Sequence, residues 1–243
     1  MSITAGDAFG ALIAKLRRMS PIDQQDAEAI RAMPFQTDRA RAGTYLVRER
    51  QEVDRCCVLL TGYACRSKLT GEERRQIVSF HFPGDMLDLQ NLLLSTADHN
   101  IQTITDATFA WVAVAASRDL VHSRPHVAAA FWRDTLIDAS IFREWVLNVG
   151  QRDGRSRLAH MLCEFAVRQA AAGSGGPDRF DLPMTQEHIA DAPGMTPIHV
   201  NGMLAALEAE GVIILNKRAV MITDWERMRR LADFDPAYLH QAA

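Results

Sequence analysis

The sequence lacks the segments that direct a chain to or across a membrane. Met1–Asp7 contains no basic stretch followed by an apolar run, so we expect no signal peptide. No uncharged apolar stretch approaches the roughly 18 residues that a membrane span needs. Cysteines are few, and without an export signal we expect their thiols to be reduced. They are Cys56, Cys57, Cys65 and Cys163. These absences predict a cytoplasmic protein with no membrane partner.

An excess of positive charge is also absent. The net charge of the 243 residues is −3 and the isoelectric point is about 6.2. Because binding to phosphates needs a local basic face, any such face must be confined to one part of the chain. Glycine and proline number only 14 and 9, and 48% of the residues are hydrophobic. This composition is typical of a folded globular protein.

In the first half of the chain the pattern of apolar residues changes from one typical of helices to one typical of strands. Leu12–Met19 and Asp23–Met33 predict two helices, which are followed by short apolar runs separated by turn residues. These runs are Tyr45–Val47, Cys56–Leu60, Ile77–Phe82 and Phe109–Val114. Short strands at nearly regular spacing indicate a β sandwich or barrel. Apolar residues alternate with Ser79 and His81, so we expect that strand to be buried on one face.

A long helix is predicted between Pro125 and Gln151. One set of its residues recurs at alternating steps of three and four, which makes a heptad seam. The seam comprises Trp132, Thr135, Ala139, Phe142, Val146 and Val149. Phe131, Ile137, Ile141 and Trp145 are apolar on another side, so both sides need a covering surface. The sequence leaves two interpretations open, a buried core helix and a dimerisation helix, and the C-terminal part of the chain favours the second.

The most informative segment runs from Met184 to Leu204. Thr185 predicts a helix start, Gly194 a tight turn, and Thr196 with Pro197 the start of a second helix. Two strands around Asn216-Lys217-Arg218 and a last helix after Thr223-Asp224 complete the order of a winged helix-turn-helix.

Two surfaces of this unit are candidates for contact with double-stranded DNA. The first is the early part of the second helix, where an Asn can bind adenine and an apolar side chain can meet a thymine methyl. Lys217 and Arg218 at the wing tip, with Arg152, Arg155 and Arg157 at the base, are candidates for phosphate contact. The predicted DNA-binding residues are Thr185, Gln186, Thr196, Pro197, Ile198, His199, Asn201, Gly202, Lys217 and Arg218. The second helix holds no Lys or Arg and carries Glu208 and Glu210, which counts against this interpretation.

The sequence resembles the cyclic-AMP receptor/fumarate-nitrate regulator (CRP/FNR) superfamily of bacterial transcription factors. Four stretches carry the resemblance, together with the helix-turn-helix from Thr185 to Asn201. They are Arg75-Gln76-Ile77, Phe82-Pro83-Gly84-Asp85, Arg157–Leu162 and Thr223-Asp224-Trp225-Glu226. The resemblance implies an α+β chain with an N-terminal jelly-roll sensor (cyclic-nucleotide-binding-like), a long dimerisation helix and a C-terminal winged helix-turn-helix. It also implies a homodimer on a near-palindromic operator.

We expect these parts to span residues 1–125, 126–151 and 152–243. The same resemblance places the effector pocket at Asp88, Leu89, Ala97 and Asp98. Cyclic-nucleotide binders carry a Gly-Glu and an Arg-Ser pair at the corresponding positions. No Lys or Arg occurs from Gln76 through Ser117, so a buried cyclic phosphate would lack a cationic partner. Cyclic AMP is therefore not the expected effector, and the small-molecule effector stays unidentified.

Other signals are weak. Cys56, Cys57 and Cys65 could form a redox switch, but free cysteines are more often buried small hydrophobes. His81 and His99 lack metal-ligand spacing, so we expect no metal and no cofactor. RNA polymerase is a further candidate partner.

The sequence is compatible with three classes of function. The favoured class is a dimeric DNA-binding regulator controlled by an effector or redox signal, and not an enzyme. The second is a sensor or interaction protein whose helix-turn-helix no longer binds DNA specifically. A cupin-type enzyme is disfavoured, because the chain contains no His-x-His pair.

Overall fold

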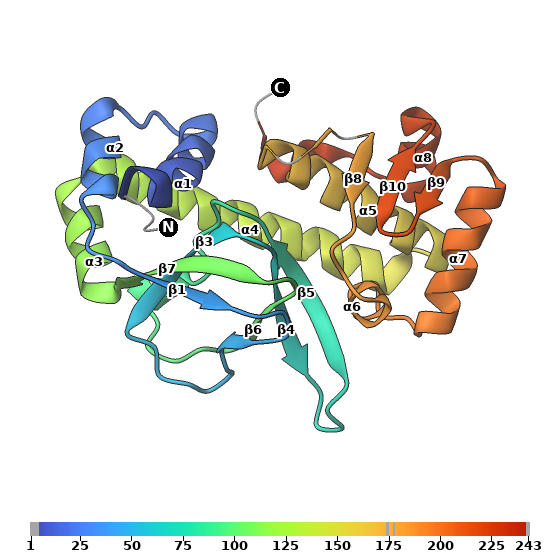
Figure 1. The fold of residues 1–243 in the computed structure, drawn as a ribbon, viewed down its shortest axis with the longest axis horizontal. Coiled ribbons are helices and arrows are strands. Elements are labelled where there is room, and N and C mark those ends of the chain that lie inside the picture. The colour runs from blue at the N-terminus through green and yellow to red at the C-terminus, as the bar shows by residue number, and fades with distance from the viewer. Residues whose placement is uncertain (1–4, 174, 177, 242–243) are drawn as a thin grey trace. The chain divides into compact units, whose positions relative to one another are not determined.

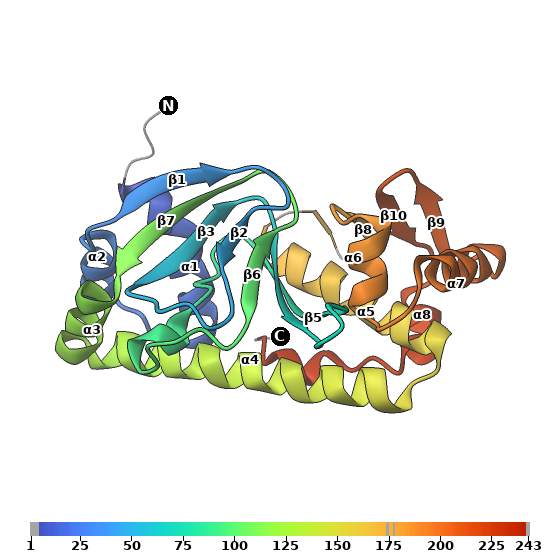
Figure 2. The same ribbon diagram turned by 90° about the horizontal axis from the view of Figure 1, so that it is seen from below.

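The computed structural model describes residues 5–173, 175–176 and 178–241. Two compact units share the chain. Unit 1 contains 1–67, 81–140 and 240–243, and unit 2 contains 68–80 and 141–239. Figures 1 and 2 show the elements from two directions. Within the described residues no helix could span a lipid bilayer.

Two antiparallel sheets form the β-roll. One has the strand order β1-β7-β3, with β1 at Gln36–Ala40, β7 at Ala107–Ala113 and β3 at Arg55–Thr61. The other has the order β2-β6-β4-β5, from Tyr45–Val47, Asn100–Thr103, Ala64–Leu69 and Arg75–His81. Side chains of β3 alternate between two hydrophobic clusters. Cys56 and Val58 pack towards the helices, whereas Cys57 and Leu59 pack inside the roll.

Helices cover one side of the roll. α1 (Ala5–Met19) buries Phe9, Leu12 and Leu16, and α2 (Gln24–Arg31) buries Ile30 in the same cluster. The 3-10 helix η1 (Leu89–Leu92) lies between β5 and β6 in the chain. After β7 the chain continues into α3 (Val114–Ser123) and α4 (Pro125–Gln151).

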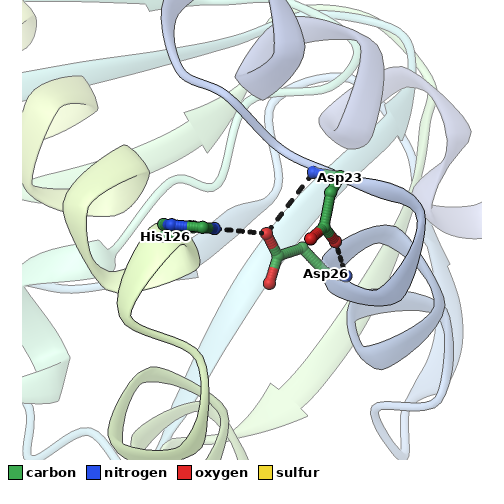
Figure 3. Close-up of side chains that lie close together, drawn as sticks. All are labelled: Asp23, Asp26 and His126. Carbon is green, nitrogen blue, oxygen red and sulfur yellow. Dashed lines mark hydrogen bonds and ion pairs between the residues drawn. The ribbon is translucent and has the colours of Figure 1, made fainter.

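Asp23 and Asp26 fix the start of α2 by a capping box. The Asp23 side chain accepts from the Asp26 N–H, and the Asp26 side chain accepts from the Asp23 N–H. His126, in the first turn of α4, adds a contact of 3.2 Å from its Nδ1 to Asp26 Oδ2 (Figure 3). The three residues therefore join α2 to the beginning of α4.

An ionic cluster connects α1, the roll and α4 inside unit 1. Lys15 Nζ lies 2.8 Å from Asp85 Oδ1 and 2.8 Å from Asp134 Oδ1. Burial lowers the pKa of Lys15, but Asp134 and Asp85 outweigh it and the pKa is raised. The lysine is therefore charged, as a buried ion pair requires.

The Pro83-Gly84-Asp85 turn needs its glycine. Gly84 has φ +94°, and a Cβ there would lie 2.9 Å from the backbone carbonyl carbon and oxygen of Ala11. Both the left-handed backbone and the close approach of α1 favour glycine.

Unit 2 is a winged helix-turn-helix. α5 (Gly154–Ala171) packs against α8 (Trp225–Ala232) and carries the buried Phe165. β8 (Arg179–Asp181), β10 (Ala219–Ile222) and β9 (Ile213–Asn216) form a three-stranded sheet in that order. α6 (Gln186–Asp191) and α7 (Pro197–Ala209) complete the unit, and η2 (Pro236–Leu239) follows α8.

The structure confirms the predicted fold class and corrects some details. Four strands were not predicted, namely β1, β4, β6 and β8. The strand β5 is covered on both faces near its end, because Ser79 and His81 are 0% and 5% exposed. The prediction of one-sided burial there was wrong. Gly173-Ser174-Gly175-Gly176-Pro177 predicts a flexible loop, and Ser174 and Pro177 in it lie outside the described residues.

Candidate DNA interface and effector site

The helix-turn-helix is formed by α6, a glycine turn and α7. The Thr185 side chain accepts from the His188 N–H at the start of α6, and Thr196 does the same for His199 at the start of α7. Gly194 in the turn has φ +68°, which favours glycine. The Met195 N–H donates to Ala190 O at 2.9 Å and closes the turn. The caps and the turn predicted from the sequence are therefore present.

α7 presents its first two turns outward. Val200, Leu204 and Leu207 are buried on its inner side, whereas Ile198 is 85% exposed. In both views α7 lies at the margin of unit 2 (Figures 1 and 2). The residues predicted to read bases lie at the start of this helix. Thr196 is the N-cap, Pro197 is the first helical residue, and Ile198, His199, Asn201 and Gly202 follow it. Ile198, His199, Asn201 and Gly202 are exposed, as are Thr185 and Gln186 at the start of α6.

His199 is the most constrained of these residues. A Cβ on Gly154 would lie 2.8 Å from His199 Nε2, so the ring rests on the backbone at the beginning of α5. Ile198 and Asn201 are further exposed side chains of the outward face that were predicted to read bases.

Glu208 on α7 and Glu210 at its C-cap are both engaged at the far end of the helix. Glu208 Oε1 accepts from the Leu215 N–H at 3.0 Å. Glu210 forms ion pairs with Arg155 and Arg227. These carboxylates hold β9, α5 and α8, so they do not place negative charge on the outward face of the first turns. The objection raised by the acid content of α7 is thereby weakened.

The wing tip is the turn between β9 and β10. Lys217 and Arg218 are both exposed there. Lys217 has φ +57°, a left-handed conformation that costs a side chain with a Cβ but not glycine.

The three arginines predicted at the base of the unit serve a different role. Arg152 is buried and forms ion pairs with Glu144 and Asp233. Arg157 donates to the carbonyl oxygens of Pro193 and Arg152. With Arg155 paired to Glu210, all three are engaged within unit 2. The prediction that they contact phosphates is therefore not supported by the geometry.

α4 has the two apolar sides that its sequence predicts. Phe131, Ile141 and Trp145 are buried within the chain. On the seam, Trp132 and Val146 are 71% and 70% exposed. Thr135 is also exposed, and three further members are partly exposed, namely Ala139, Phe142 and Val149. Leu136 and Leu147 are exposed too, although the seam did not include them. A strict heptad spacing misses them because it selects only a narrow stripe of the helix.

The predicted effector-pocket residues separate into two kinds. Leu89 packs against the cluster beneath α1 and α2, and Ala97 belongs to the cluster inside the roll. Asp88 and Asp98 instead lie on either side of His99. Asp88 Oδ1 is 3.3 Å from His99 Nε2, and Asp98 Oδ1 is 2.6 Å from His99 Nδ1.

Arg66 is a cation that the sequence pattern did not reveal, because it precedes the Gln76–Ser117 window. It is buried on β4 and donates to Asp138 at 2.6 Å and to Leu87 O at 2.7 Å. Asp138 neutralises it, so it is not a ready partner for a phosphate.

All four cysteines are buried, and none forms a disulfide within the described residues. Burial raises the pKa of Cys56 and Cys163 to about 12, and raises that of Cys57 well above its ordinary value. A thiol held protonated reacts slowly with oxidants. The burial of these side chains therefore favours an effector over a redox signal.

Comparison with known proteins agrees with this arrangement. Residues 37–124 match the model of the cyclic nucleotide-binding domain, and residues 156–231 match that of the Crp-like helix-turn-helix domain. The transcriptional activator protein FnrL of Cereibacter sphaeroides is 30% identical over 199 residues, covering 80% of this chain and 79% of FnrL. The chain belongs to the CRP/FNR family of transcription regulators.

Further relatives extend the comparison. The nitrogen fixation regulation protein FixK of Azorhizobium caulinodans is 26% identical over 74% of this chain and 73% of its own length. The structure of FixK2 from Bradyrhizobium japonicum superposes with a TM-score of 0.75 at 22% identity, over 82% of this chain and 98% of that one. This CRP/FNR protein is a DNA-binding transcription regulator, and its relatives belong to a family of regulators rather than of enzymes.

Proposed function

We propose that this CRP/FNR regulator acts in the cytoplasm as a homodimer that inserts two copies of α7 into successive major grooves of a near-palindromic operator. The observation that carries the proposal is the outward face of α7, which is exposed, uncharged at its start and capped by Thr196. A helix N-terminus of this kind also favours phosphate contact.

The proposed dimer surface is the exposed apolar side of α4. Trp132, Leu136 and Val146 leave large apolar areas uncovered on one helix, which is unusual for a monomer. Pairing of two such helices would bury them and set two α7 helices about one DNA turn apart.

Base reading is assigned to Ile198 and Asn201, and phosphate contact to Lys217 and Arg218. Asn can bind adenine in two places, and an apolar side chain can meet a thymine methyl. The wing residues position the protein without reading sequence. The resemblance to the family implies an Arg at the position of Gly202 and, in its most familiar member, Arg-Glu at Pro197-Ile198, so we expect an operator of different sequence.

The signal is proposed to reach unit 2 through elements that both units share. α4 and the β4–β5 hairpin each continue from one unit into the other. An effector bound in the roll would change the balance between two arrangements of α4 pairs. Contact of the DNA-bound dimer with RNA polymerase is the corresponding route to activation.

Selection from a library of random duplex DNA tests the proposal. We expect enrichment of an inverted repeat whose half-sites lie about 10 base pairs apart. Binding of the selected DNA should be at least about a thousandfold tighter than binding of unrelated DNA. Failure to enrich any sequence at low salt would favour the alternative of a sensor protein whose helix-turn-helix no longer binds specifically.

A further inference from the structure

A compact polar site lies where η1 meets the loop before β6. Asp88 Oδ1 accepts from Gln90 Nε2 at 2.9 Å and lies 3.3 Å from His99 Nε2. Gln90 Nε2 and His99 Nε2 are 3.5 Å apart, so the three side chains converge on one point. Asp88 is 1% exposed and His99 6%, so the site is nearly closed to solvent.

Asp88 Oδ2 has no hydrogen-bond partner within the part of the chain that the structure describes, and Asp88 is 1% exposed. No Lys or Arg of the described chain forms an ion pair with Asp88. Buried carboxylates are ordinarily paired with a cation or bound to a metal, because burying an uncompensated charge is costly.

Asp98 orients the histidine towards Asp88. Its Oδ1 lies 2.6 Å from His99 Nδ1, and in the tautomer that donates Nδ1–H to Asp98 the lone pair of Nε2 faces Asp88 and Gln90. Gln90 Nε2 lies against both atoms, 2.9 Å from Asp88 Oδ1 and 3.5 Å from His99 Nε2, and Asp88 Oδ2 has no hydrogen-bond partner within the described residues. A carboxylate behind a histidine whose other nitrogen faces a ligand position is the usual outer shell of a metal site.

We propose that this site binds one divalent transition-metal ion, with Asp88 and His99 as ligands. Gln90 can supply a third ligand by turning its amide so that oxygen faces the ion, and Asp98 is a positioning residue. Imidazole with carboxylate and amide oxygen suits Zn²⁺, Fe²⁺, Mn²⁺ or Ni²⁺ rather than Ca²⁺ or Mg²⁺. This site names the class of effector for the regulator proposed above, and its role as a signal rests on that function.

A second group of possible ligands provides the matched control. Asp23, Asp26 and His126 have ligand atoms within 4.8 Å of one another (Figure 3). Their carboxylates already form the capping box of α2, and the His126 side chain is 62% exposed. We therefore expect any binding there to be weak.

Titration of the metal-free full chain with Co²⁺ and Zn²⁺ tests the site. Visible absorption of Co²⁺ reports coordination by imidazole and carboxylate, and calorimetry with Zn²⁺ gives the stoichiometry. We expect one ion per chain. Asp88→Asn and His99→Gln should weaken binding at least about tenfold, Asp98→Asn should weaken it less, and His126→Gln should leave it unchanged. No binding, binding unaffected by Asp88→Asn, or binding lost in His126→Gln would overturn the proposal.

Stability of the metal-free variants separates a ligand from a structural partner. If the Asp88 carboxylate has no cationic partner in the metal-free chain, Asp88→Asn removes an uncompensated charge. The variant then melts at the same temperature as the metal-free parent or at a higher one. If His99 instead carries a second proton as the fixed partner of Asp88, the variant melts lower and the proposal fails. DNA binding is measured separately, so loss of metal binding and loss of operator binding are distinguishable results.

Discussion

Arg75 on β5 donates from Nε to Asp191 Oδ2 at the end of α6, at a distance of 2.7 Å. The neighbouring Gln76 amide donates to the carbonyl oxygens of Asp191 and Ala192, each at 2.8 Å. Both contacts lie beside the turn that leads to α7. Residues 68–80, which belong to unit 2, are therefore bound to the helix-turn-helix of the same unit.

A double-mutant cycle measures this connection. Both side chains are partly buried, so we expect a coupling energy of about 0.5–1 kcal/mol between Arg75→Ala and Asp191→Ala in urea unfolding. Strictly additive effects of the two substitutions would show that the ion pair contributes nothing to holding β5 on α6.

Lys217→Gly separates DNA binding from folding at the wing. The substitution relieves the left-handed backbone at φ +57°, so the melting temperature should stay level or rise. Loss of the cation should weaken DNA binding and reduce the slope of log affinity against log salt by about 0.9. The measurement is binding at several salt concentrations, with Met221→Gly outside the turn as control for loss of a side chain. An unchanged slope would remove Lys217 from the interface.

Trp132→Glu tests the assembly. A charge on the exposed apolar side of α4 should convert the dimer into a monomer and reduce operator affinity, because one half-site cannot supply the contacts of two. Light scattering coupled to size exclusion gives the mass. The neighbouring Arg133→Glu places the same side chain off the seam, with a net charge change of −2 instead of −1, and should still leave the dimer intact. A dimer that survives Trp132→Glu would contradict the seam.

Much of the molecule could be predicted from local chemistry. The caps at Thr185 and Thr196, the turn at Gly194 and the wing around Lys217 follow from residue preferences that act over a few positions. α4 spans Pro125–Gln151, the range that its periodicity indicated. In these segments nearest neighbours in sequence decide the conformation.

The strands that the sequence did not predict have no regular alternation of apolar residues. β6 is Asn-Ile-Gln-Thr and is buried throughout, because Gln102 and Thr103 donate to backbone oxygens of Gly43 and Arg41. β4 buries Arg66 against Asp138, a residue 72 positions away. Partners so distant in sequence cannot be read from a hydrophobic pattern. The same applies to Glu208 and Glu210, whose partners only the fold brings together.

Stability should depend on pH through His160. The ring is buried and stacks on Tyr238, and burial, with the nearby charge of Arg152, lowers its pKa to about 3. Its Nε2 lies 3.3 Å from Glu144 Oε1, but Arg152 holds that carboxylate at 2.7 Å. The folded chain therefore keeps the ring neutral while the unfolded chain protonates it below about pH 6.5.

The contribution of His160 is present above about pH 6.5 and is lost as the pH falls towards 3. Between about pH 7 and pH 4.5 the free energy of unfolding should decrease by roughly 1–3 kcal/mol from this group. Urea unfolding at both values measures the change. His160→Phe keeps the stacking and should flatten the dependence; an equal decrease in the variant would assign it to other groups.

The operator specificity of Asn201→Ala tests most directly whether the outward face of α7 reads bases. The ratio of affinities for the selected operator and for unrelated DNA should fall roughly tenfold or more, while the slope against salt stays unchanged. A ratio equal to that of the parent protein would mean that the sequence is read elsewhere, or not at all.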